Sequence, residues 1–197
     1  MPERHPTTKR LIAEALKLFA DNGVRATPIV KIEEAAGLAP GSGAFYKHFR
    51  SKEQLLEAAV EDAASASAFG RGRFAAYAEF SLADQARLLA RGTWLMFDSH
   101  RDLFLVMTRD TRDRPYNYTH EPGGWPGDGP AFVTAWLADR VAAGEFAVAD
   151  PQATAVVLLD ALTSYWFQRE TESKSPYGVD AERFIESWVE LVMGLAR

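Results

Sequence analysis

The stretch from Thr27 to Leu56, which reads TPIVKIEEAAGLAPGSGAFYKHFRSKEQLL, constrains the fold more strongly than any other part of the chain. Thr27 and Pro28 are a helix start signal, because a hydroxyl residue can cap a first turn and proline suits the first helical position. Gly37 ends this short helix, and residues 40–43 (Pro-Gly-Ser-Gly) then form a turn rich in small residues. The pattern predicts two short helices separated by a tight turn, where the backbone can come close to another molecule.

Further helices flank this pair. Thr7 or Thr8 can cap a first helix, whose apolar residues recur at helical spacing. Ser51 and Gln54 match a capping box that opens a longer helix ending near Ala68. The first fifty residues therefore predict three short helices, of which the second and third form a helix-turn-helix. In such a unit the second helix of the pair lies in the major groove of DNA.

The rest of the chain also has helical periodicity, and no strand-like alternation appears. Gly70 and Gly72 interrupt the pattern after the helix that begins near Ser51. Capping residues before apolar runs predict later helices that begin after Ser81, Asp150 and Asp180. We predict an all-α fold of about nine helices, with an N-terminal domain at residues 1–50 and a larger helical domain at residues 51–197.

The charge of the chain is divided between these two parts. Residues 1–52 hold nine Lys/Arg and five Asp/Glu, whereas the remaining residues hold 13 and 22. A basic head on an acidic body is expected when only the head meets phosphate. The competing interpretation is chance segregation of charge in a short window.

The composition excludes several classes of protein. The chain has no cysteine, so disulfides, thiolate metal sites and a cysteine nucleophile are excluded. The N-terminus lacks an apolar export segment, and no apolar run approaches the ~20 residues of a membrane span. A soluble cytoplasmic protein is expected.

The N-terminal part of the chain resembles the TetR family of transcriptional regulators. The resemblance runs from about Thr8 to Leu56 and rests on Thr27, Ile32, Ala36-Gly37-Leu38, Phe45-Tyr46-Lys47-His48-Phe49 and Ser51-Lys52-Glu53. It implies a three-helix DNA-binding domain followed by a helical ligand-binding and dimerisation domain. The chain departs from common members between Leu38 and Phe45, where it is about two residues longer. Phosphate-holding roles therefore transfer better than base-reading ones.

The resemblance also implies that the third helix docks in the major groove and that its flanks hold phosphates. We expect hydroxyl, imidazole and ammonium groups to hold phosphate, and the glycines to let the backbone approach DNA closely. Lys47 can donate to guanine, whereas Ser42 discriminates poorly between bases. The predicted DNA-binding residues are Thr27, Gly41, Ser42, Gly43, Tyr46, Lys47, His48 and Lys52. From the residues alone, Tyr46 and His48 could instead pack a small core, and Lys52 could be a solvated lysine.

The middle of the chain is unusually aromatic, and the resemblance implies that it encloses a ligand cavity. Aromatic and methionine walls favour a small hydrophobic or aromatic effector. The predicted pocket residues are Trp94, Phe97, Phe104, Met107, Trp125, Trp136 and Tyr165. The proline-rich loop from Thr111 to Pro130 is either a lid or only a long connection. For each single residue, ordinary core packing is the competing interpretation.

The chain ends with two strongly apolar helices, which leave little polar face. The resemblance implies that this pair forms a four-helix bundle across a two-fold axis, although both helices could be internal core. The predicted dimer-interface residues are Val156, Leu159, Thr163, Phe167, Phe184, Trp188 and Leu191.

Together these features predict a ligand-responsive homodimeric transcriptional regulator. We expect a repressor that binds a palindromic operator and is released by a small effector. The alternative is an all-α small-molecule-binding or protein-interaction module without sequence-specific DNA binding. No enzyme is predicted, because no Ser/His/Asp ordering or phosphate loop is present. No cofactor or metal is expected, since Asp98, His100, Asp102 and His120 match no strong ligand spacing.

Overall fold

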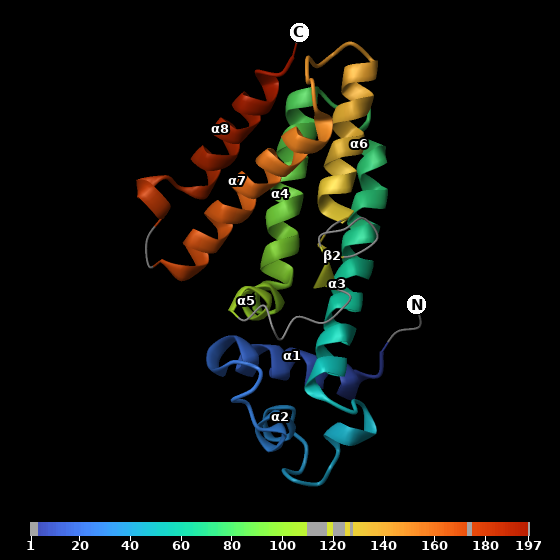
Figure 1. Ribbon diagram of the computed structural model, residues 1–197, viewed down its shortest axis with the longest axis vertical. Coiled ribbons are helices and arrows are strands. Elements are labelled where there is room, and N and C mark those ends of the chain that lie inside the picture. The colour runs from blue at the N-terminus through green and yellow to red at the C-terminus, as the bar shows by residue number, and fades with distance from the viewer. Residues whose placement is uncertain (1–3, 110–117, 120–124, 127, 173–174, 197) are drawn as a thin grey trace. The chain divides into compact units, whose positions relative to one another are not determined.

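A computed structural model describes residues 4–109, 118–119, 125–126, 128–172 and 175–196 of the protein. Over these residues the chain forms eight α-helices: α1 (Pro6–Asn22), α2 (Ile29–Ala35), α3 (Lys52–Phe74), α4 (Leu82–Ser99), α5 (Arg101–Arg109), α6 (Asp128–Ala142), α7 (Pro151–Thr171) and α8 (Ala181–Met193) (Figure 1). Three single-turn 3-10 helices accompany them: η1 (Phe45–Lys47), η2 (Ala75–Tyr77) and η4 (Pro176–Gly178). Two two-residue strands complete the described elements, β1 (Tyr118–Thr119) and β2 (Trp125–Pro126). The predicted all-α fold is confirmed, with eight α-helices where about nine were expected.

The chain packs as two compact units. Unit 1 comprises residues 1–65 and 100–119, and unit 2 comprises residues 66–99 and 120–197. The long helix α3 begins in unit 1 and ends in unit 2. This division concerns packing, and the functional boundary predicted at residue 50 stays a prediction. None of the described helices has a stretch long and apolar enough to cross a membrane.

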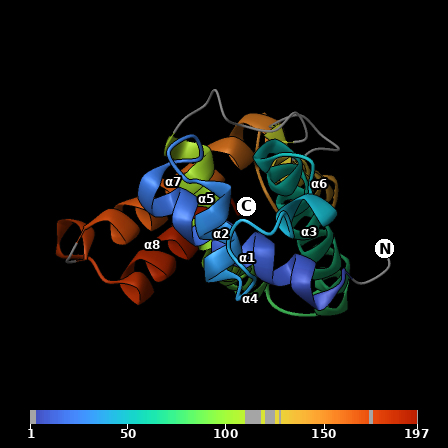
Figure 2. The ribbon, with the colours of Figure 1, turned by 90° about the horizontal axis from the view of Figure 1, so that it is seen from below.

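Unit 1 is built around α1, which lies between α5 and α2 (Figure 1). Leu11, Ala15 and Phe19 of α1 are fully buried, since they recur on one face at helical spacing. At the end of α5, Arg109 donates to the carbonyl oxygens of Ala20 and of its neighbour, which are among the last carbonyls of α1. Figure 2 views this unit from the side of α2 and the turn that follows it.

Unit 2 is a helical bundle in which α4 packs against α7 and α8, and α6 packs against α7 (Figure 1). Its core is held by hydrogen-bonded aromatic residues. The fully buried Trp166 donates from its indole N–H to a carboxylate oxygen of Asp98 at 2.7 Å. On the outside of the bundle, Arg87 of α4 forms two hydrogen bonds of 2.7 Å with Glu186 of α8. Burial supplies the stability, and these polar partners fix which faces meet.

Local capping signals locate several helix starts correctly. Ser81 Oγ accepts from the N–H of Asp84 at 3.1 Å, and α4 begins at the next residue after Ser81. Asp150 and Asp180 each accept a backbone N–H three residues on, at 3.0 and 2.9 Å, and so cap α7 and α8. These predictions are confirmed. A cap can be predicted from the sequence because it uses only groups that are neighbours along the chain.

Two other predictions about helix ends are wrong. His5 caps α1 in place of Thr7 or Thr8: its Nδ1 accepts from the N–H of Thr7 at 3.2 Å, and proline fills the first helical position. Gly70 and Gly72 do not interrupt α3, which continues to Phe74. Glycine lowers helix propensity by only about 1 kcal/mol relative to alanine, so a long helix can carry two.

Candidate nucleic-acid interface

The segment predicted to be a recognition helix is a turn followed by the single 3-10 turn η1. Gly41 and Gly43 have φ values of +73° and +70°, in the left-handed region that glycine adopts most readily. A right-handed α-helix cannot continue through such residues, so the regular helix expected before Phe49 does not form. The backbone instead closes single turns, as in the bond from the N–H of Tyr46 to the carbonyl of Gly43 at 3.1 Å.

Two buried phenylalanines anchor this segment. Phe45 is fully buried, Phe49 is 4% exposed, and their ring centroids lie 5.9 Å apart. Because they are four residues apart, they point to the same side, and the residues between them turn elsewhere. Tyr46 is 60% exposed and Lys47 is also exposed. The phenol of Tyr46 and the ammonium group of Lys47 therefore face outward from a segment that the two buried phenylalanines hold in place.

Two predicted phosphate contacts face the interior instead. The Thr27 side chain is 2% exposed, and its hydroxyl donates to the carbonyl oxygen of Gly23 at 2.8 Å. Pro28, and not Thr27, is the N-cap of α2, without a side-chain capping bond. The predicted cap and the predicted phosphate contact of Thr27 are therefore both corrected, since a buried donor with a partner cannot also reach DNA.

Lys52 is the second of these residues. Its ammonium group donates to the carbonyl oxygens of Val24, Arg25 and Thr27, at 2.5, 3.4 and 3.0 Å. An ammonium has three donors, and here all three are used within the protein. Lys52 ties the α1–α2 connection to the start of α3. The sequence placed it correctly in the first turn of a helix, but could not show these distant acceptors.

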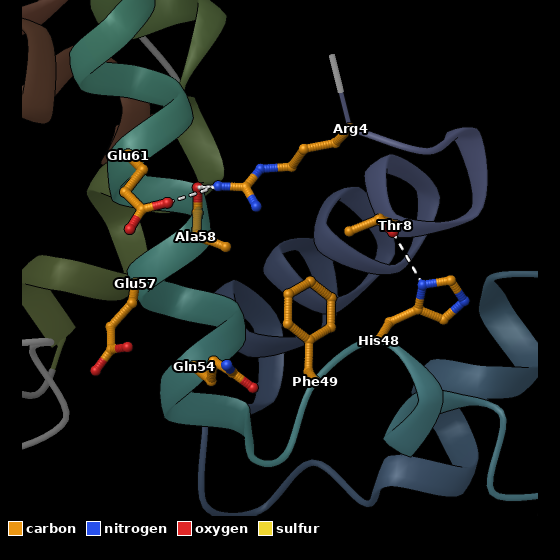
Figure 3. A pocket seen from close by; sticks show the side chains of 8 residues that line it. All are labelled: Arg4, Thr8, His48, Phe49, Gln54, Glu57, Ala58 and Glu61. Carbon is orange, nitrogen blue, oxygen red and sulfur yellow. Dashed lines mark hydrogen bonds and ion pairs between the residues drawn. The ribbon is translucent and has the colours of Figure 1, made fainter. Parts of the chain in front are cut away.

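The other predicted residues remain at the surface of the turn or close to it. Gly41 and Ser42 are exposed, Gly43 is half-buried, and the hydroxyl of Ser42 accepts from the N–H of Ala44 at 3.3 Å. His48 is half-buried, and its Nδ1 lies 2.9 Å from the hydroxyl oxygen of Thr8 (Figure 3). Among them, Tyr46 and Lys47 are the side chains best placed for a partner outside the protein.

A cleft of about 190 Å³ lies beside this segment and has Arg4, Thr8, His48, Glu57 and Glu61 in its lining. Figure 3 shows Arg4 reaching from the N-terminal segment toward α3. Its guanidinium bonds Glu61 at 2.8 Å and also the neighbouring carboxylate of residue 62. Burial opposes the charge on Arg4, but these hydrogen bonds outweigh it, so the pKa of Arg4 is raised. Arg4 and Glu61, which form an ion pair with each other, are both part of the lining of this cleft.

The start of α3 carries a shifted form of the predicted capping box. The hydroxyl of Ser51 accepts from the N–H of Gln54 at 3.2 Å, and the side-chain oxygen of Gln54 accepts from the N–H of Arg50 at 2.7 Å. Hydrogen bonds from the Ser51 hydroxyl and from its own backbone lower the pKa of Glu53. A carboxylate in the first helical turn also faces the positive end of the helix dipole.

Sequence reasoning missed Glu33, which organises the turn from within. It is 1% exposed, and its two carboxylate oxygens accept from the N–H groups of Gly41 at 2.7 Å and Phe45 at 3.0 Å. Its position beside the buried Ile32 on a short helix is the only signal in the sequence, because a glutamate there is unusual for a core-facing face.

Residues 11–59 match the family model described as bacterial regulatory proteins, tetR family. A stretch of 59 residues is 41% identical to the HTH-type transcriptional repressor KstR2 of Mycolicibacterium smegmatis, and it covers 29% of this chain and 28% of that protein. The N-terminal domain of the chain is therefore of the TetR type. The match spans less than a third of this curated relative, so it concerns the N-terminal domain alone.

Solved structures resemble this chain over almost its whole length. A TetR-family transcriptional regulator from Thermus thermophilus superposes with a TM-score of 0.74 at 22% identity, covering 95% of this chain and 100% of the other. A gamma-butyrolactone receptor superposes with a TM-score of 0.71 at 23% identity, covering 96% and 88%. At such identities the likeness concerns the fold, and it includes the helical body after the N-terminal domain.

The residues predicted to line a ligand pocket are packed against other side chains. Trp94 stacks on Tyr165 with 5.3 Å between ring centroids, and Tyr165 stacks on Phe184 at 4.1 Å. The indole N–H of Trp94 donates to the carbonyl of Leu162 at 3.0 Å. Stacked rings with satisfied donors are typical of a core. This stack provides aromatic surface, but its role in ligand binding stays a prediction.

The other predicted pocket residues are divided between the two units. Trp136 donates to Gln85 at 2.9 Å and Trp125 donates to Ser67 at 3.2 Å, all within unit 2. Phe97 is also in unit 2 and is 5% exposed. Phe104 and Met107 belong to unit 1, on α5. Most of the predicted loop from Thr111 to Pro130 lies outside the described residues, and its last three residues begin α6.

The predicted dimer residues fall into three groups. Val156 and Leu191 are 42% and 70% exposed, and Val157, which was not predicted, is 68% exposed. Leu159, Thr163, Phe167 and Phe184 are half-buried. Trp188 is 3% exposed and donates to the carbonyl of Leu158 at 2.9 Å. Trp188 is thus a core residue of unit 2, and its assignment to the surface between subunits is corrected.

The acidic residues and histidines weighed as metal ligands have other partners where the structure describes them. The Asp98 carboxylate accepts from Trp166 and also from Arg169, at 2.5 Å. His120 lies outside the described residues. In the part of the chain that the structure describes, no three His, Cys, Asp or Glu residues are grouped to hold a metal ion.

The geometry around Lys52 leads to a stability prediction. Lys52→Ala removes the partner of three carbonyl oxygens and is expected to lower the free energy of unfolding by about 1.5–3 kcal/mol, as for hydrogen bonds to a charged group. Lys47→Ala is the matched control, because Lys47 is exposed and is expected to change stability by less than about 0.5 kcal/mol. Urea unfolding followed by far-UV circular dichroism measures both. Equal stability of the two variants would contradict the structural role of Lys52.

Proposed function

We propose that this protein is a homodimeric transcriptional repressor that binds a palindromic DNA site through unit 1. One observation carries the proposal: Tyr46 and Lys47 are exposed on a turn that the buried Phe45 and Phe49 anchor. The membership of the N-terminal domain in the TetR family supports DNA binding. The name of the Mycolicibacterium smegmatis relative, a transcriptional repressor, supports repression.

The side chains on and near the turn can make different kinds of contact with DNA. Lys47 and the exposed Arg10 and Arg50 supply cations for phosphate oxygens. Tyr46 adds a hydroxyl that can donate to phosphate or to a base edge. Because Ser42 is the only other polar side chain from residue 40 to 45 and reads bases poorly, close approach of the glycine backbone carries much of the fit.

Two such heads are needed to recognise a site with useful specificity, because one head reads only a few base pairs. The exposed apolar residues Val156, Val157 and Leu191 lie on α7 and α8 and offer a surface for a second copy. Large exposed aliphatic side chains on neighbouring helices are typical of an interface. We place the dimer contact there, in line with the predicted four-helix bundle.

Release by an effector completes the proposal. Unit 2 contains the aromatic stack of Trp94, Tyr165 and Phe184, which suits a flat or hydrophobic molecule if a cavity opens beside it. A solved neighbour of this fold is a gamma-butyrolactone receptor, so lactones are reasonable first probes. An effector need only prefer the conformation that does not bind DNA, by about 1–3 kcal/mol.

DNA binding is tested with duplexes that the wild-type protein enriches from a random pool. The affinity should fall as salt rises, and Lys47→Ala should reduce the magnitude of the log–log slope by about 1 per head because one phosphate contact is lost. Tyr46→Phe should weaken binding at every salt concentration through loss of one hydroxyl. The control is Lys17→Ala, whose lysine is already paired with Glu14 at 2.8 Å. Unchanged affinity in both Lys47→Ala and Tyr46→Phe would show that another surface meets DNA.

The dimer surface is tested by placing a charge on it. Leu191→Asp should shift the protein from dimer to monomer in analytical ultracentrifugation, because a carboxylate would be buried without a partner. Leu95→Asp is a closely matched control: Leu95 on α4 is 68% exposed and Leu191 is 70% exposed. The control should remain dimeric. Dissociation of the Leu95 variant alone would move the interface to α4.

The effector step is tested with a panel of gamma-butyrolactones of increasing acyl length. A lactone that binds beside Trp94 should quench tryptophan fluorescence and should weaken DNA binding by about 5–150-fold. Trp94→Phe should remove most of the quenching while leaving unliganded DNA binding unchanged. A lactone that binds without changing DNA affinity would rule out switching by that ligand class.

A further inference from the structure

A single buried carboxylate holds both ends of the turn that precedes Tyr46. Glu33 on α2 is 1% exposed, its Oε2 accepts from the N–H of Gly41 at 2.7 Å, and its Oε1 accepts from the N–H of Phe45 at 3.0 Å. Both N–H groups belong to the stretch that is longer than in common members of the family. One side chain therefore bridges the glycine-rich part of this longer turn.

These two N–H groups lack the partners that a helix would give them. In an α-helix each would donate to a carbonyl four residues earlier, but the left-handed φ values of Gly41 and Gly43 prevent that pattern. The buried N–H of Phe45 would be costly without an acceptor, and so would the buried carboxylate of Glu33 without donors. Within the described turn, each requirement is met by the other. The neighbouring N–H of Ser42 instead donates to the carbonyl of Ala39 at 3.2 Å.

We propose that Glu33 is the positioning residue of the DNA-contacting turn. Its carboxylate takes the place of helical hydrogen bonds and sets the direction in which Tyr46 and Lys47 leave the surface. The proposal rests on the proposed function for the identity of the partner, DNA, but the internal part of it concerns the protein alone.

If Glu33 positions the turn, its loss should affect the sequence specificity of DNA binding more than the electrostatic attraction to phosphate. Phosphate contacts by flexible cations tolerate small changes of direction, whereas base readout requires hydrogen bonds of defined geometry. If Glu33 sets that geometry, its loss should weaken binding to the preferred site while leaving non-specific binding and its salt slope nearly unchanged. A residue that only maintained the fold would reduce both kinds of binding together.

The internal part is tested by amide hydrogen exchange in the free full-length protein, observed by NMR. Glu33→Gln keeps the size of the side chain but has one acceptor oxygen, and its NH₂ group would face an N–H donor. Exchange of Gly41 or Phe45 should therefore accelerate by about tenfold or more. Glu34→Gln is the matched control: Glu34 is the next residue, is exposed, and pairs with Lys31 at 2.8 Å. It should leave both amides unchanged.

The wild-type protein provides a second measurement that does not depend on the variant folding. Corrected for intrinsic rates, the amides of Gly41 and Phe45 should exchange at least about tenfold more slowly than that of Gly43, for which the described turn has no acceptor. Equal exchange of the three amides, or unchanged exchange in Glu33→Gln, would overturn the proposal.

A DNA-binding measurement then distinguishes the role of Glu33 inside the protein from its role in DNA recognition. With a duplex enriched by the wild-type protein and a scrambled duplex of equal length, Glu33→Gln should reduce the ratio of the two affinities about tenfold or more, as for loss of a base contact. Glu34→Gln should keep the ratio. Absence of any DNA preference in the wild type, with the exchange result as expected, would refute the proposed function and leave Glu33 as an organiser of the turn. Equal loss on both duplexes would contradict its role in positioning.

Discussion

The burial of Phe45 and Phe49 is the interaction on which the presentation of the head depends. Both rings lie in the small core of unit 1, one helical turn apart in sequence. Since the chain between them is too short to cross the core, Tyr46 and Lys47 must face outward. Hydrophobic burial thus acts indirectly on the side chains proposed to contact DNA, because it holds the two residues that flank them in place.

Two polar side chains then determine the conformation of the connections between the buried residues. Lys52 binds carbonyl oxygens of the α1–α2 connection, and Glu33 binds N–H groups of the following turn. Lys52 is a cation that donates to carbonyl oxygens, and Glu33 is an anion that accepts from N–H groups. Each side chain is the hydrogen-bond partner of backbone groups that have no partner within a helix. A small domain without disulfides has few other means of ordering its loops.

The sequence predicted what depends on neighbouring residues and missed what depends on distant ones. The caps at Asp150 and Asp180 and the all-α class follow from spacing along the chain, and the structure agrees. The partners of Lys52 and Glu33 are backbone groups eight or more residues away, and the inward position of Thr27 depends on packing that periodicity does not describe. Trp188 was likewise assigned to the dimer interface, because the sequence could not show that its indole binds the carbonyl of Leu158 on α7 of the same chain.

These internal bonds change the meaning of the charge asymmetry. Of the basic residues in the head, several are already engaged: Arg4 with carboxylates of α3, Lys17 with Glu14, Lys31 with Glu34, and Lys52 with carbonyls. Formal charge therefore overstates the cations that remain for phosphate. Under the proposed function, close backbone approach and well-directed side chains must therefore contribute much of the DNA affinity. That requirement explains why a turn rich in glycine would need a buried carboxylate to hold it in one conformation.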